Sequence, residues 1–139
     1  MPRRNPLRVE APMRWVVALL LLVAPLANLR ADDTRLYEVK EGNKVDAKTL
    51  MGWKTWRALA CERCHGAAQE GLVGPPLVES LKRLSKEDFH TTIMNGRPDK
   101  GMPPFNSSQM VNQNWEGLYA YLKGRSDGQI QPGHLYPID

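Results

Sequence analysis

The stretch Cys61-Glu62-Arg63-Cys64-His65 decides how the rest of this chain is interpreted. A Cys-x-x-Cys-His run is typical of covalent attachment of c-type haem. Two thiols one helical turn apart can add to the two vinyl groups along one porphyrin edge. The histidine directly after the second cysteine is then placed to be the proximal ligand of the iron. We therefore predict one haem c held by Cys61 and Cys64, with His65 as a metal ligand.

The length and the cysteine count limit the other possibilities. The chain has 139 residues and two cysteines. This length suits one small domain. Because the haem motif uses both cysteines, no thiol remains for a disulfide framework or for a four-cysteine zinc site.

The basic character of the chain belongs to its N-terminus. The pI is 9.2. Five of the 19 Lys and Arg residues, but only one of the 15 Asp and Glu residues, lie in residues 1–31. Residues 32–139 are therefore formally neutral, with 14 basic and 14 acidic residues. This distribution argues against a nucleic-acid partner.

Residues 1–31 have the pattern of a secretory signal peptide. A basic segment precedes the apolar run Trp15–Ala24, and Pro25 follows. The run is shorter than the roughly 20 apolar residues that cross a bilayer. Cleavage after Ala31 would release the mature chain into the periplasm, and haem c is attached after export. An uncleaved leader would instead anchor the protein to the membrane.

The remaining sequence divides into an N-terminal extension (32–45), a helical domain (46–124) and a C-terminal tail (125–139). The extension contains Glu41-Gly42-Asn43 between short apolar stretches, which predicts a small hairpin. Gly124 is a typical helix terminator, and two prolines in the tail favour an extended chain.

Helix-start signals predict three helices. Asp46 is an N-cap for a helix to Ala60, and Ser85 begins a capping box for a helix to about Met94. A shorter helix is possible over 77–84. Ser107 or Ser108 can cap the last helix. The apolar face predicted for that helix consists of Met110, Val111, Trp115, Leu118, Tyr119 and Leu122.

A low-spin electron-transfer haem needs a second axial ligand, and a thioether there raises the reduction potential. The sequence offers Met51, Met94, Met102, Met110, His90 and His134. Met102 is the best candidate, because the loop Gly101-Met102-Pro103-Pro104 can hold a thioether at a fixed distance from the iron. Met94 and Met110 have helical core spacing and are expected to pack. His90 is expected at the surface, and His134 could approach the haem only if the tail folds back.

Pro75 is a candidate for orienting His65. Histidines that ligate a metal donate their other ring N–H to an acceptor such as a backbone carbonyl. Gly74-Pro75, about ten residues after His65, could supply that carbonyl. An ordinary turn explains the same pair equally well.

Together these motifs resemble the class I cytochromes c over residues 46–124. The resemblance is carried by the haem motif with Gly66, by Gly74-Pro75-x-Leu77, by Asn95-Gly96 with Met102-Pro103-Pro104-Phe105, and by Leu118, Tyr119, Tyr121 and Leu122. It implies an all-α cytochrome c fold of three to five helices around one covalently bound haem. It also implies that Pro75 accepts the hydrogen bond from His65, that Met102 is the sixth ligand, and that the face of Gly52 and Trp56 crosses the terminal helix.

A narrower resemblance concerns residues 37–66 and the run Leu118–Arg125, which are similar to cytochromes linked to methanol or alcohol oxidation. It implies an electron donor, a quinoprotein (PQQ-dependent) alcohol or methanol dehydrogenase. The acceptor would be a terminal oxidase or another cytochrome. We expect an electron-transfer protein rather than an enzyme, and a monomer.

Three alternatives remain. A haem sensor or haem enzyme would need an open or displaceable sixth position. A thiol–disulfide oxidoreductase using Cys61 and Cys64 would need a thioredoxin-like context, and the surrounding sequence is helical. A zinc site would need ligands beyond His65 that the sequence does not place nearby.

Overall fold

The computed structural model describes residues 35–139, and the predicted signal peptide lies outside them. The helices are α1 (Ala47–Ala58), α2 (Glu62–His65), α3 (Leu77–Ser80), α4 (Lys86–Asn95), the 3₁₀ turn η1 (Pro98–Lys100) and α5 (Gln109–Ser126). The strands are β1 (Val39–Lys40), β2 (Lys44–Val45) and β3 (Tyr136–Pro137). The predicted all-α class is confirmed, because the strands are only two residues long.

The helices begin where the sequence predicts. The side chain of Asp46 accepts a hydrogen bond from the Thr49 N–H at 2.9 Å. Ser85 accepts one from the Asp88 N–H at 3.0 Å, and Ser108 caps α5 in the same way. Each cap satisfies an N–H group that has no partner inside its helix. These caps fix where α1, α4 and α5 start.

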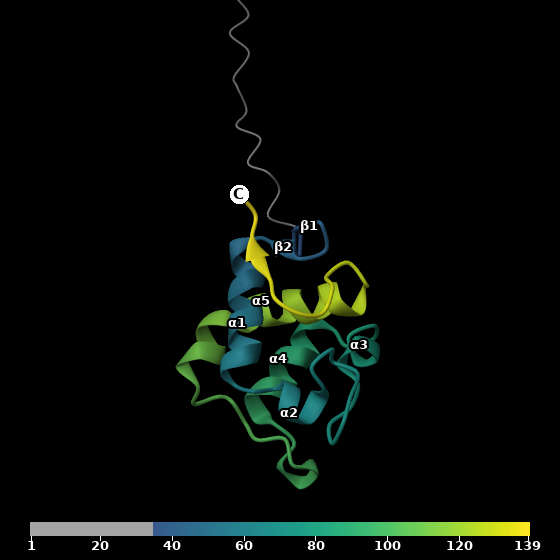
Figure 1. Cartoon of the computed structure of the whole chain (residues 1–139). Helices are drawn as coiled ribbons and strands as arrows, with labels where there is room; N and C mark the ends of the chain where they lie inside the picture. The colour runs from purple at the N-terminus through teal and green to yellow at the C-terminus, as the bar shows by residue number, and fades with distance from the viewer. Residues whose placement is uncertain (1–34) are drawn as a thin grey trace, which may run out of the picture. The chain divides into compact units, whose positions relative to one another are not determined.

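Helices α1 and α5 cross in close backbone contact at two glycines (Figure 1). A Cβ added to Gly52 would lie 1.9 Å from the Gly117 carbonyl oxygen. A Cβ added to Gly117 would lie 2.3 Å from the Lys48 carbonyl oxygen. The two helix backbones therefore touch, as the resemblance implied for the Gly52 face. Trp56, one turn after Gly52, then meets Tyr121, with the ring centroids 6.2 Å apart.

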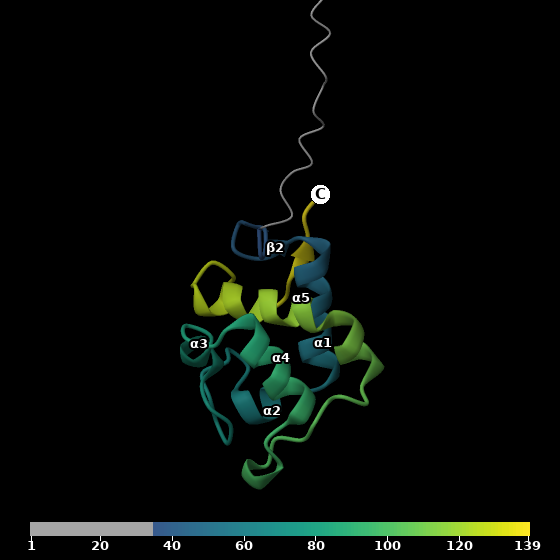
Figure 2. The ribbon, with the colours of Figure 1, turned by 180° about the vertical axis from the view of Figure 1, so that it is seen from behind.

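The other helices extend the core from this crossing. Figure 2 shows α3 and α4 beneath α5, on the side that holds α2. Phe89 and Ile93 of α4 are buried, and Phe89 packs against Tyr119 of α5 at 5.3 Å between ring centroids. Leu81, directly after α3, is also buried. Phe89, Ile93 and Leu81 all line the cavity described below.

The N-terminal extension and the tail pack together. β1 and β2 form the predicted antiparallel hairpin, and β2 pairs in parallel with β3 (Figure 1). The tail is therefore not simply extended. It folds back onto the domain, and Ile130 and Leu135 in it are 0% and 2% exposed.

Two predictions about α5 are wrong. Gly124 does not end the helix, which continues to Ser126. A Cβ there would lie 2.4 Å from Cδ1 of the buried Ile130, so a larger residue would force that side chain to shift. Met110 does not belong to the buried face, since 42% of its surface is exposed in the first turn of α5.

Among residues 35–139, no helix combines the length and apolar character needed to cross a membrane.

The glycine crossing yields a stability prediction. Gly52→Ala should lower the free energy of unfolding by about 3 kcal/mol, because the added methyl group forces α1 and α5 apart. This loss exceeds the gain of about 1 kcal/mol that alanine brings to a helix. Gly128→Ala is the control, because its Cβ meets nothing within 4 Å. It should cost only about 1 kcal/mol for a positive φ angle. Guanidinium denaturation of both variants measures the difference, and equal losses would contradict the crossing as the tight contact.

Candidate haem-binding site

The Cys-x-x-Cys-His motif directly follows α1. The chain turns at Ala60, whose φ of 52° lies in the left-handed region, and then enters α2. The N–H groups of Cys64 and His65 both donate to the Cys61 carbonyl, at 3.2 and 3.0 Å. This helical turn directs Cys61, Cys64 and His65 to one cavity.

Hydrogen bonds from the segment 71–75 hold the haem motif around His65. Its Nδ1 atom lies 2.9 Å from the Pro75 carbonyl oxygen, so the hydrogen bond that the resemblance implied is present. The Gly71 N–H donates to the His65 carbonyl at 2.7 Å, and the Gly74 N–H donates to the Cys64 carbonyl at 2.8 Å. With Nδ1 donating its proton to Pro75, Nε2 keeps a free lone pair.

Gly74 allows this close approach. A Cβ at this position would lie 2.8 Å from Cε1 of His65 and 2.9 Å from Nδ1. Any larger residue would push against the imidazole ring. The glycine before Pro75 is therefore a steric requirement of the His65 position.

Met102 lies in a small closed loop after α4. The Arg97 N–H donates to the Met102 carbonyl at 2.8 Å, and the Met102 N–H donates to the Arg97 carbonyl at 3.1 Å. The Phe105 N–H donates a hydrogen bond to the Ile93 carbonyl of α4 at 3.0 Å. At Gly96, a Cβ would lie 2.5 Å from the Pro103 carbonyl carbon, so the loop also packs tightly on the end of α4. Met102 is thus held by its backbone on both sides.

A cavity of about 710 Å³ brings these residues together. Cys61, Cys64, His65 and Met102 all line it, and so does Pro75. The volume lies within the range of about 300–1,000 Å³ typical of cofactor sites. The apolar lining comes from Trp56, Leu59, Leu77, Leu81, Leu84, Phe89, Ile93, Phe105, Leu118 and Leu122. A large apolar space with two thiols, an imidazole and a thioether fits a haem attached by its edge.

Sequence reasoning missed three cations on this cavity. Arg83, Arg97 and Lys100 line it, and none of them has a carboxylate partner within 4.0 Å in the described part of the chain. Haem carries two propionate groups, and unpaired cations beside an apolar cavity suit carboxylates. In the sequence, only the position of Arg97 in the loop that contains Met102 pointed to a role at this site.

A buried polar network was also missed. Gln69 is fully buried and donates to the Tyr121 hydroxyl at 3.0 Å. Arg125 donates to the Gln69 side-chain oxygen at 2.6 Å and to the Ala68 carbonyl at 3.1 Å. Burial raises the pKa of Tyr121 to about 12, so its hydroxyl stays protonated. The network ties the segment after the haem motif to α5.

The other methionines and histidines within residues 35–139 do not line the cavity. Met51 and Met110 are exposed, whereas Met94 packs against the core as predicted. His90 is half-buried rather than a surface residue, with its ring 4.2 Å from that of Trp115. The tail does fold back, but it brings His134 to Trp53 and not to the haem cavity.

The geometry does not favour the thiol or zinc alternatives. Burial raises the pKa of the Cys61 thiol to about 12, whereas a thiol–disulfide nucleophile needs a lowered pKa. Within residues 35–139, no group of three or more His, Cys, Asp or Glu side chains could hold a metal ion.

Comparison with known proteins gives consistent matches. The family described as "Cytochrome C oxidase, cbb3-type, subunit III" matches residues 47–122. Cytochrome c-555 of Methylococcus capsulatus is 44% identical over 92 residues, which cover 66% of this chain and 73% of that protein. Cytochrome c55X of Pseudomonas aeruginosa is 28% identical over 99 residues, covering 70% of this chain and 74% of that protein.

A solved structure supports the same assignment. The crystal structure of the c-type cytochrome XoxG from Methylobacterium extorquens AM1 superposes with a TM-score of 0.66 at 31% identity, covering 74% of this chain and 67% of that chain. Proteins of the c-type cytochrome family carry a covalently bound haem c. With its fold, its cavity and its relatives, the chain belongs to the class I c-type cytochromes, which are electron carriers rather than enzymes.

Proposed function

We propose that Cys61 and Cys64 hold the haem by thioether bonds and that His65 and Met102 are the axial ligands of its iron. The observation that supports this assignment is that all four side chains line one apolar cavity. When bound, the haem supplies a ferric/ferrous couple for one-electron transfer.

The residues around the ligands keep them in place. The hydrogen bond from His65 to the Pro75 carbonyl fixes the tautomer and the orientation of the ring. The paired backbone bonds between Arg97 and Met102 hold the thioether loop. Ligands that are fixed in this way need little rearrangement when the charge on the iron changes. The thioether of Met102 would raise the reduction potential.

The two propionate groups of a haem would also need charged partners. Arg83, Arg97 and Lys100 are the residues on this cavity that could pair with the propionates. The apolar walls would keep much of the porphyrin out of water. Such burial, together with the thioether, would favour the ferrous state, in which the iron–porphyrin core is formally neutral rather than positively charged.

We further propose that the protein works in the periplasm, takes electrons from a quinoprotein alcohol or methanol dehydrogenase, and passes them to a terminal oxidase or another cytochrome. The support is the signal-peptide pattern of residues 1–31 and the resemblance of residues 37–66 and 118–125 to cytochromes of alcohol oxidation.

Removing the thioether tests the sixth ligand. Met102→Ala should abolish the far-red charge-transfer band of thioether-ligated ferric haem and allow rapid carbon monoxide binding to the ferrous protein. The reduction potential should fall by on the order of 0.1 V, within the roughly 0.8 V that axial ligands control. Met110→Ala is the matched control, because Met110 is exposed. An unchanged far-red band in Met102→Ala would contradict the ligand assignment. Fast carbon monoxide binding by the wild type would favour the sensor or enzyme alternative.

Crowding His65 tests its orientation by Pro75. Gly74→Ala should shift the electron paramagnetic resonance g-values of the ferric protein, because the new methyl group would lie 2.8 Å from Cε1 of His65. Gly128→Ala is the control, since its Cβ meets nothing within 4 Å and Gly128 does not line the haem cavity. A spectrum of Gly74→Ala identical to that of the wild type would show that this contact does not position the ligand.

Mixing experiments test the electron donor. The oxidised cytochrome should be reduced within seconds by a quinoprotein alcohol dehydrogenase and its alcohol, and not when the alcohol is omitted. Stopped-flow absorbance at the reduced haem bands provides the measurement. Reduction by dithionite but not by the dehydrogenase would contradict the donor while leaving the haem assignment intact.

A further inference from the structure

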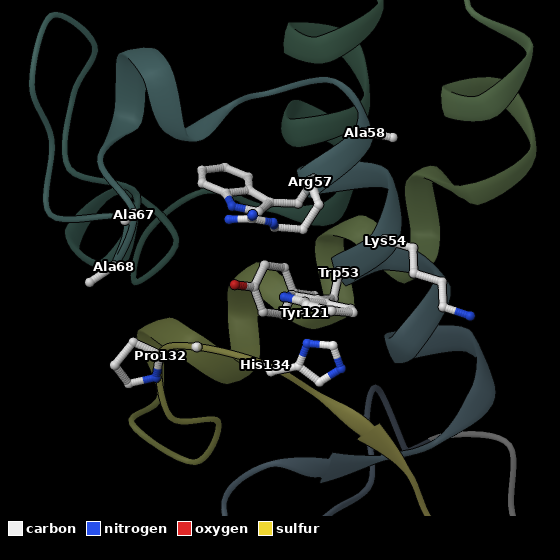
Figure 3. A pocket seen from close by; sticks show the side chains of 11 residues that line it. Trp53, Lys54, Arg57, Ala58, Ala67, Ala68, Tyr121, Pro132 and His134 are labelled. Carbon is white, nitrogen blue, oxygen red and sulfur yellow. The ribbon is translucent and has the colours of Figure 1, made fainter.

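A second hollow of about 810 Å³ lies between α1, α5, residues 67–68 and the tail (Figure 3). We call it the α1–tail pocket. Within the described residues, Trp56 alone lines both this pocket and the haem cavity. Trp56 is 2% exposed, and its ring lies 6.3 Å from that of His65 between centroids. The pocket is therefore separate from the haem site but only one side chain away from it.

Aromatic rings make up much of the α1–tail pocket. Trp53 meets His134 edge to face, with the ring centroids 4.7 Å apart and an interplanar angle of 73°. Tyr121 lies against Trp56 on the other side. The small residues Ala67 and Ala68 also line the pocket, apart from Trp53 and His134 in Figure 3. Rings arranged in this way suit a flat aromatic group.

The charge of the pocket is positive. No Asp or Glu of the described residues lines it, whereas Lys54 and Arg57 do. Figure 3 shows the Arg57 side chain reaching toward Tyr121, while the Lys54 side chain points away from the other labelled residues. Arg57 is thus the cation that faces the interior.

Arg57 has N–H donors that its ion pair does not use. Its one carboxylate contact runs from Nη1 to Oε1 of Glu62 at 3.4 Å, longer than a strong ion pair. A guanidinium carries five N–H donors, so several remain for another carboxylate. The side chain is also more than half exposed, so a ligand can reach it.

We propose that the α1–tail pocket binds a small planar aromatic carboxylate. Arg57 binds the carboxylate, and the ring of the ligand lies among Trp53, Tyr121 and His134. This site is distinct from the electron-transfer function and does not depend on which protein donates the electron.

The test uses the full holo-cytochrome and 2-naphthoate as the probe. Isothermal titration calorimetry should give saturable one-site binding with a Kd of about 1 mM or tighter. Arg57→Gln should weaken it by about tenfold or more, because a charge-assisted bidentate contact is lost. Lys48→Gln, the same loss of charge at an exposed position of α1 outside the pocket, should stay within about twofold of the wild type. The neutral 2-naphthylmethanol should bind at least about tenfold more weakly than 2-naphthoate.

Two further measurements locate the bound probe. His134→Ala removes an exposed ring of the tail without touching the core, and it should weaken binding several-fold even if Arg57→Gln folds poorly. The haem absorption spectrum should not change on binding. Absence of saturable binding, equal effects of the Lys48 and Arg57 changes, or a haem spectrum showing carboxylate at the iron would each overturn the proposal.

Discussion

The backbone contact between α1 and α5 at Gly52 and Gly117 is the constraint on which the rest of the molecule depends. It fixes the direction in which α1 ends, and the haem motif follows that end directly. It also places Trp56 against Tyr121, between the two cavities. Around the crossing, residues of α3, α4 and the Met102 loop line one large apolar cavity. This lining fits the covalently bound haem c that membership of the c-type cytochromes implies.

The sequence predicted the parts of the site that local signals encode. The haem motif, the Gly74-Pro75 pair and the Met102 loop each carry their own residue pattern, and the structure brings them to one cavity. The helix caps were predictable for the same reason, because the capping side chain and the N–H group that it satisfies are at most three residues apart. The resemblance added the crossing of α1 with α5, which no single segment reveals.

Features that depend on distant partners were not predictable. Gly124 has the local character of a helix terminator, but the return of the tail turns it into a packing site for Ile130. Gln69 gives no signal of its own, because its importance comes from Tyr121 and Arg125 on a helix far along the chain. The parallel pairing of β2 with β3 is hidden for the same reason. In each case the decisive contact forms only in the folded chain.

The most direct test of the account is the intact mass of the protein under denaturing conditions, measured after expression with export and haem attachment. The account predicts a mass equal to the mature chain plus one haem, with no thiol available for alkylation and the haem located on the peptide that contains Cys61 and Cys64. A mass equal to the bare chain, with both thiols free to react, would contradict it.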